Sequence, residues 1–146
     1  MPVYGLSVGS SAAAASGAAF WELRVSTRQV RVYKMKVTNT TTVVANVGLI
    51  MASNTPAGTA TQQVAVPYDN NDAAALLRGE AAWTTAPTVG SNYIDQFTVG
   101  GAAGNGVVEP WQSDKEIKLA TSTSLIFWNW GGSSGPALSI SLALEE

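Results

Sequence analysis

Residues 137–144, with the sequence ALSISLAL, decide the fold class that this chain predicts. Within them Leu138, Ile140, Leu142 and Leu144 alternate with small residues. An apolar period of two is typical of a β-strand that buries one face and leaves the other open. The stretch therefore predicts a half-buried strand, whose apolar face needs a second sheet or layer to cover it.

The rest of the chain supplies further strands. Residues 124–130, SLIFWNW, are rich in aromatic and branched side chains, and residues 131–136, GGSSGP, follow with turn chemistry. We therefore expect residues 124–130 and 137–144 to form a closing hairpin. With the strand patterns at residues 21–25, 29–37 and 42–51, and shorter ones elsewhere, the sequence predicts about eight or nine strands.

The strand predicted at residues 29–37 changes its apolar parity midway. Val30 and Val32 share one parity, whereas Tyr33, Met35 and Val37 share the other. A change of parity within one strand indicates a β-bulge or a strand that passes between sheets.

One segment has helical features, residues 71–79. Asp72 is placed as an N-cap and Gly79 as the residue after the last turn, so a short helix near residues 72–78 is predicted. One short helix among many strands favours an all-β fold, an antiparallel β-sandwich of jelly-roll type, over an α/β fold. An eight-stranded barrel is the alternative. Residues 1–17 have few large apolar side chains and are expected to form an N-terminal arm or extended segment, with residues 18–146 forming one β-sandwich domain.

Composition argues against most catalytic functions. The chain has no His and no Cys, which removes the usual catalytic triads, histidine metal sites and thiolate chemistry. Residues 69–72, DNND, carry oxygen ligands but lack the glycine and distal glutamate of an EF-hand loop, so Asx turns are the expected role. Glu22, Asp114 and Glu116 lie among polar positions and are expected to be solvated. We therefore predict no catalytic residues, no metal, no cofactor and no enzymatic activity.

Charge and hydropathy limit the partners. Charged residues are 12% of the chain, against roughly 25% in ordinary domains. A net charge of −2 is unlike the basic face of a nucleic-acid binder. No stretch provides the roughly 20 apolar residues that a membrane helix needs. The predicted partners therefore include neither nucleic acid nor membrane.

The five Trp residues are the remaining candidates for function. Trp21, Trp128 and Trp130 share faces with apolar neighbours and are predicted to lie in the core. Trp83 and Trp111 occupy loop-like segments, and with Tyr93 they are the candidate interface residues, because exposed aromatics serve protein interfaces and sugar stacking.

A resemblance extends over most of the chain. It rests on the Ala/Gly/Ser-rich N-terminal segment, on residues 83–89, WTTAPTV, and on residues 125–131, LIFWNWG. Together they resemble the small virion proteins of tailed phages that decorate and cement the capsid. The resemblance implies a homotrimer on the outer surface of the capsid, bound to the major capsid protein and bridging capsomers, with residues 1–17 reaching the shell or a neighbouring subunit.

A different function fits the same fold. A carbohydrate-binding or receptor-binding module of a phage fibre or tail would present the faces of Trp83, Trp111 and Tyr93 to a ligand. Clustering of these aromatics on an exposed surface would favour this alternative, whereas burial between subunits would favour assembly.

Overall fold

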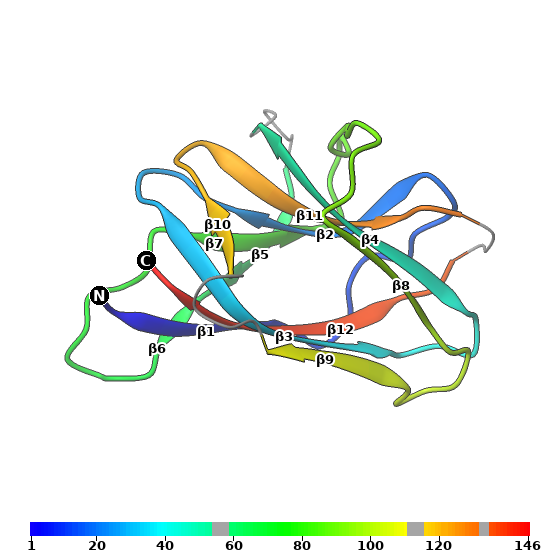
Figure 1. Cartoon of the computed structure of the whole chain (residues 1–146), viewed down its shortest axis with the longest axis horizontal. Helices are drawn as coiled ribbons and strands as arrows, with labels where there is room; N and C mark the ends of the chain where they lie inside the picture. Colours follow the sequence, from blue (N-terminus) through cyan, green and yellow to red (C-terminus); the bar gives the residue numbers. More distant parts are fainter. Residues whose placement is uncertain (54–58, 111–115, 132–134) are drawn as a thin grey trace.

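Two antiparallel six-stranded sheets pack face to face (Figure 1). The computed structural model describes residues 1–53, 59–110, 116–131 and 135–146, with the backbone alone at residues 108–110. Sheet A consists, in order, of β6 (Val66–Pro67), β1 (Val3–Val8), β12 (Leu138–Glu145) and β3 (Val30–Asn39), and the other edge of β3 pairs with both β10 (Ile117–Leu119) and β9 (Gly106–Pro110). Sheet B consists of β5 (Thr61–Val64), β7 (Arg78–Ala81), β2 (Ala18–Arg24), β11 (Thr123–Asn129), β4 (Ala45–Ser53) and β8 (Asp95–Val99).

The strand order is that of a jelly roll. Sheet A contains the run β1-β12-β3-β9, and sheet B contains the run β2-β11-β4-β8. The chain alternates between these two runs, except that β4 and β8 both belong to sheet B, as two Greek keys do when they are wrapped together. The predicted antiparallel sandwich is confirmed, and the open ends of both sheets distinguish it from the alternative barrel.

The stretch that decides the fold class behaves as predicted. Leu138, Ile140, Leu142 and Leu144 of β12 are all buried in the core between the sheets. Because β12 pairs with β1 on one side and β3 on the other, its apolar row lies in the middle of sheet A. This row forms one half of the core, which residues such as Leu125 and Phe127 of β11 complete from sheet B.

The predicted irregularity in β3 is a β-bulge. Ala143 pairs with Lys34, but the next residue, Leu144, pairs with Val32, so Tyr33 is the extra residue. Val32 before the bulge and Met35 after it are both fully buried. The bulge therefore keeps both halves of β3 facing the core despite their opposite parities.

The predicted closing hairpin is wrong. β11 pairs with β2 and β4 in sheet B, whereas β12 pairs with β1 and β3 in sheet A. The link between them therefore crosses from one sheet to the other. Residues 132–134 of the Gly-rich linker lie outside the described residues, and turn chemistry does not specify which strands pair on either side of a linker.

The expectation of an N-terminal arm is corrected as well. β1 pairs with β12 through six residues and with β6 through two. Tyr4, Leu6 and Val8 are buried in the core, and the Ser11 hydroxyl accepts a hydrogen bond from the Leu138 N–H. The segment has few large apolar residues, but three at alternate positions are enough to fill the place of a central strand. Residues 1–17 thus belong to the sandwich.

The short helix predicted near residues 72–78 is absent, and the described residues contain no helix. The Asp69 carboxylate accepts a hydrogen bond from the Asn71 N–H at 2.9 Å, which is the Asx turn expected there. Gly79 lies inside β7, where a Cβ would be less than 3.0 Å from three atoms of the Trp21 indole. A two-turn helix has little stability of its own, and pairing of β7 with β2 takes its place.

We expect Gly79→Ala to destabilise the fold, because the new methyl group would displace the buried Trp21 indole. Overpacking of this kind costs about 1 to 3 kcal/mol in the free energy of unfolding, which urea denaturation would measure. Gly90→Ala is the control, since a Cβ at Gly90 meets no atom within 4 Å. Equal stability of the two variants would contradict the contact between Gly79 and Trp21.

The substitution Leu6→Ala tests whether β1 is a strand of the core or a detached arm. Removal of this buried side chain should cost about 2 to 5 kcal/mol, whereas Ser7→Ala on the exposed face of the same strand should change stability by less than about 0.5 kcal/mol. The two melting temperatures would provide the comparison. If neither substitution lowered the melting temperature, β1 would not be part of the core.

Candidate functional site

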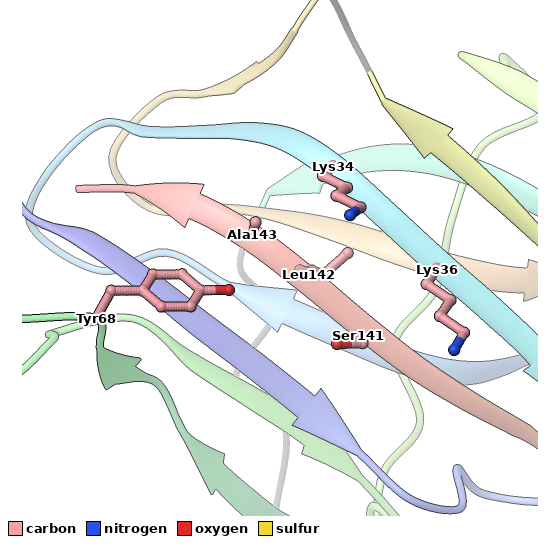
Figure 2. Close-up of a pocket in the computed structure, with 6 residues that line it drawn as sticks. All are labelled: Lys34, Lys36, Tyr68, Ser141, Leu142 and Ala143. Atoms are coloured by element: carbon pink, nitrogen blue, oxygen red, sulfur yellow. The ribbon is translucent and has the colours of Figure 1, made fainter.

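A hollow of about 140 Å³ lies on the outer face of sheet A (Figure 2). It is lined by Lys34, Lys36, Tyr68, Ser141, Leu142 and Ala143. Lys34 and Lys36 come from β3 and Tyr68 from the turn after β6, so the lining groups reach β12 from both sides. Three segments that are distant in the sequence therefore meet at one place.

The strand register gives the hollow its floor. Gly5, Ala143 and Lys34 form one row across β1, β12 and β3, and Ser7, Ser141 and Lys36 form the next row. Side chains in such rows share a face of the sheet. Small residues on β1 and β12 leave space, and the two lysines stand along one side of that space.

Tyr68 forms the opposite side. Its backbone N–H donates a hydrogen bond to the Val3 carbonyl at 2.9 Å, which holds the residue beside β1. Its ring lies across β1, where a Cβ on Gly5 would be 3.4 Å from the phenolic oxygen (Figure 2). Because Gly5 has no side chain, the ring lies close to the sheet while the residue as a whole is 69% exposed.

The two lysines of the hollow differ from four other cations of the chain, which form ion pairs. Arg24 and Arg78 both pair with Glu80, and Arg31 and Lys118 both pair with Glu116. Within the described part of the chain, neither Lys34 nor Lys36 has a carboxylate within 4.0 Å. The hollow is therefore lined by hydrogen-bond donors and by positive charge that no described acid neutralises.

Two of the predicted interface residues lie elsewhere, in the segment of residues 82–94. Trp83 and Tyr93 are both half-buried. Tyr93 packs on Gly48 of β4, where a Cβ would be less than 3.0 Å from two atoms of its ring. Trp111 lies outside the described residues. The structure thus places Trp83 and Tyr93 in one covering segment and gives neither a fully exposed face.

The predicted core aromatics divide into three cases. Trp21 is fully buried in the core, as predicted, and contacts Phe127 edge to face. Trp128 is only half-buried and Trp130 is 41% exposed, so their placement in the core is wrong. On β11 the core positions belong to Leu125 and Phe127, which puts Trp128 on the other face, where it pairs with Gly48. Alternation alone did not tell which face of β11 was the inner one.

The same outer face of sheet B holds two buried acids that the sequence did not reveal. Gln62, Glu80, Glu22, Ile126 and Ile50 pair in turn across β5, β7, β2, β11 and β4. Glu22 is fully buried and Glu80 almost so, which corrects the expectation that Glu22 is solvated. Ile50 and Ile126 are also buried, although they are not part of the core between the sheets. The local sequence pattern around Glu22 and Glu80 did not indicate that residues 82–94 would cover this face of sheet B.

The two acids have different partners. Glu80 accepts a hydrogen bond from Arg78 Nε at 2.5 Å, and its other oxygen lies 3.6 Å from Arg24. Glu22 accepts a hydrogen bond from the Ser124 hydroxyl at 2.5 Å, while its second oxygen and the Trp83 indole nitrogen are both buried and lie outside ordinary hydrogen-bond geometry. Both arginines thus lie close to Glu80, whereas the close polar contact of Glu22 is with the Ser124 hydroxyl.

Burial raises the pKa of the Glu22 carboxyl. The Ser124 hydroxyl, the positive charge of Arg24 and the Trp83 indole lower this pKa, whereas the negative charge of Glu80 raises it further. Both acids are covered and almost inaccessible to solvent. The ionisation of Glu22 therefore affects the stability of the fold.

Comparisons with known proteins identify no relative: no family model, no curated protein and no solved structure matches the chain. In the described residues, no helix is long and apolar enough to cross a membrane. In the same residues, no three acidic side chains gather in a way that could hold a metal ion.

Glu22→Gln should change how stability depends on pH. Because the pKa of Glu22 is raised above 4.5, the unfolded chain loses this proton first as the pH rises. The stability that Glu22 contributes is therefore fully present below pH 4.5 and is lost as the pH rises toward the pKa of the folded state. Urea denaturation at several pH values should show Glu22→Gln gaining stability relative to the parent chain as the pH rises.

The control is Asp95→Asn, which removes an exposed carboxylate on β8. Its stability difference from the parent chain should change little over the same pH range. A difference for Glu22→Gln that stayed constant with pH would show that the pKa of Glu22 is not raised.

Proposed function

We propose that the protein is a structural subunit of a phage particle, a homotrimer that decorates the outer surface of the capsid and bridges capsomers of the major capsid protein. One observation carries the assembly part of this proposal: two exposed valines, Val64 and Val66, on the side of the sandwich where the chain crosses between the sheets. We call these two residues the side wall.

The side wall lies where two sheet ends meet. β5 is the end strand of sheet B, and β6 is an end strand of sheet A, with Ala65 between them. Ala65 is buried in the core, while Val64 is 70% and Val66 66% exposed. Alternation along this crossing thus turns apolar side chains away from the core.

An end strand with exposed apolar side chains favours association. No further strand of the described residues pairs with its outer edge, which leaves backbone N–H and C=O groups there without a strand partner. Natural monomers protect such edges with lysine, proline or a covering segment. β6 has a proline, Pro67, but β5 has neither lysine nor proline, and the side wall adds two exposed valines in a chain with few charges. Another copy would cover them, and contacts that run head to tail around a threefold axis close into a trimer.

The decoration role rests on the resemblance to capsid cement proteins and on chemistry suited to a shell. A cement protein stabilises its shell through many repeated contacts, each worth about 25 cal/mol per Å² of apolar surface buried. The absence of His and Cys makes such contacts insensitive to mild acid and to redox conditions.

The alternative, a carbohydrate-binding or receptor-binding module of a phage fibre or tail, is less well supported in its predicted form. It relied on Trp83, Tyr93 and Trp111 as stacking faces. The first two are half-buried in the segment that covers sheet B.

Replacing both valines of the side wall by lysine should break the oligomer. We expect light scattering to give three times the chain mass of 15.1 kDa for the parent protein and a single chain mass for Val64→Lys/Val66→Lys. The variant should keep its melting temperature, because both side chains are exposed. It should also fail to co-sediment with capsids assembled from the major capsid protein of the same phage.

Val44→Lys is the matched control, because it adds a lysine at an exposed valine outside the side wall. A monomeric parent protein at all concentrations would overturn the trimer. A trimeric parent protein that did not co-sediment with capsids would overturn the decoration role and leave self-association standing.

A further inference from the structure

We propose that the hollow on sheet A binds an acidic saccharide, with Lys34 and Lys36 holding a carboxylate or sulfate group and Tyr68 stacking on the sugar ring. This inference goes beyond the assembly role. Every residue that it uses comes from one copy of the chain, so it does not require a trimer.

The polar groups around the hollow favour an anion. Two lysine ammonium groups, the Tyr68 hydroxyl and the Ser141 hydroxyl line it, and among the described side chains no carboxylate does so. Lys34 and Lys36 stand two residues apart on the same face of β3, both exposed, with the buried Met35 between them. Like charges side by side on a sheet disfavour one another, and a bound anion would relieve that repulsion.

The aromatic group favours a saccharide over a simple inorganic anion. Tyr68 is exposed while its ring lies across Gly5, so one face of the ring is open to solvent on the side of the hollow opposite the lysines (Figure 2). Aromatic faces of this kind combine an apolar surface with a polar edge, which suits a sugar ring. An ion such as phosphate would use the lysines but would have no use for the ring.

Tyr33 and Glu145 lie near the Tyr68 ring. Burial raises the pKa of the Tyr33 hydroxyl at the bulge, and Tyr68 and Glu145 raise it further, so the two tyrosines lie near each other. The Glu145 carboxylate lies 3.9 Å from the amino group of Met1. This acid is therefore engaged beside the hollow and is not one of the groups that line it.

The volume of the hollow fits one charged sugar unit. At about 140 Å³ it is smaller than the roughly 300 to 1,000 Å³ of sites that enclose a whole drug-sized ligand. The small side chains of Ser141 and Ala143 let the ligand approach the sheet. One acidic residue of a longer chain would enter, and its neutral neighbours would extend over the surface.

Isothermal titration calorimetry with three probes tests the proposal: a hyaluronan tetrasaccharide, a heparin tetrasaccharide, and the hyaluronan tetrasaccharide with its carboxylates reduced to alcohols. At least one charged probe should bind about tenfold or more tightly than the reduced probe, as expected for charge-assisted hydrogen bonds. Lys34→Gln/Lys36→Gln should remove this preference. Tyr68→Ala should weaken binding of the charged tetrasaccharide but not of inorganic phosphate.

Lys118→Gln is the matched control, because it removes one exposed lysine of sheet A outside the hollow and should leave affinity nearly unchanged. Equal loss in the control and in the double variant would show general attraction to a charged surface and overturn the site. Phosphate binding as tight as saccharide binding, or no binding of either charged probe, would also overturn the proposal. Light scattering on the same samples reports the oligomeric state, so failure of the assembly role would be seen separately.

Discussion

The contact between Trp21 and Gly79 determines where β7 and β5 lie, and both the side wall and the hollow depend on these strands. The Trp21 indole is fully buried, packs on the bare backbone of Gly79, meets Phe127 edge to face at 5.6 Å and donates a hydrogen bond to Gln63 at 2.9 Å. One side chain of β2 therefore contacts β7, β11 and β5. β5 leads directly into the segment that crosses between the sheets, which carries the side wall and continues to Tyr68. The packing of Trp21 therefore determines the position of the side wall and of the Tyr68 side of the hollow.

Sheet B is unusual in being covered on both faces. Its inner face packs on sheet A, and residues 82–94 cover part of its outer face, where Ile50, Ile126 and the two acids are buried. Removing carboxylates from water is unfavourable unless hydrogen bonds or opposite charges compensate. Arg24 and Arg78 supply that compensation to Glu80, while Glu22 relies on the Ser124 hydroxyl and takes a raised pKa. By contrast, the outer face of sheet A carries a hollow lined with hydrogen-bond donors.

Local sequence patterns correctly predicted the structural features that depend only on residues close together in the chain. The alternation in residues 137–144 and the parity change at Tyr33 each follow from the geometry of a single strand, and both predictions were correct. Predictions that needed a distant partner failed. The Gly-rich linker did not indicate that β11 and β12 belong to different sheets, and Gly79 looked like the end of a helix because the indole that requires a glycine lies 58 positions earlier in the chain. The hollow was missed for the same reason, since its residues come from three separate segments and only the register of β1, β12 and β3 brings them together.

The side wall and the hollow are joined by one short segment, and its alternation keeps their roles apart. Ala65 points into the core, Val64 and Val66 point outward, and Tyr68 turns its ring onto β1. Val66 pairs with Gly5, the residue over which the Tyr68 ring lies, so the two surfaces adjoin. A neighbouring copy packed on the side wall would therefore approach the rim of the hollow without needing Lys34 or Lys36. Because those lysines lie on β3, beyond β12 from the side wall, assembly through the wall leaves the charged side of the hollow facing outward, where a ligand on another surface can reach it.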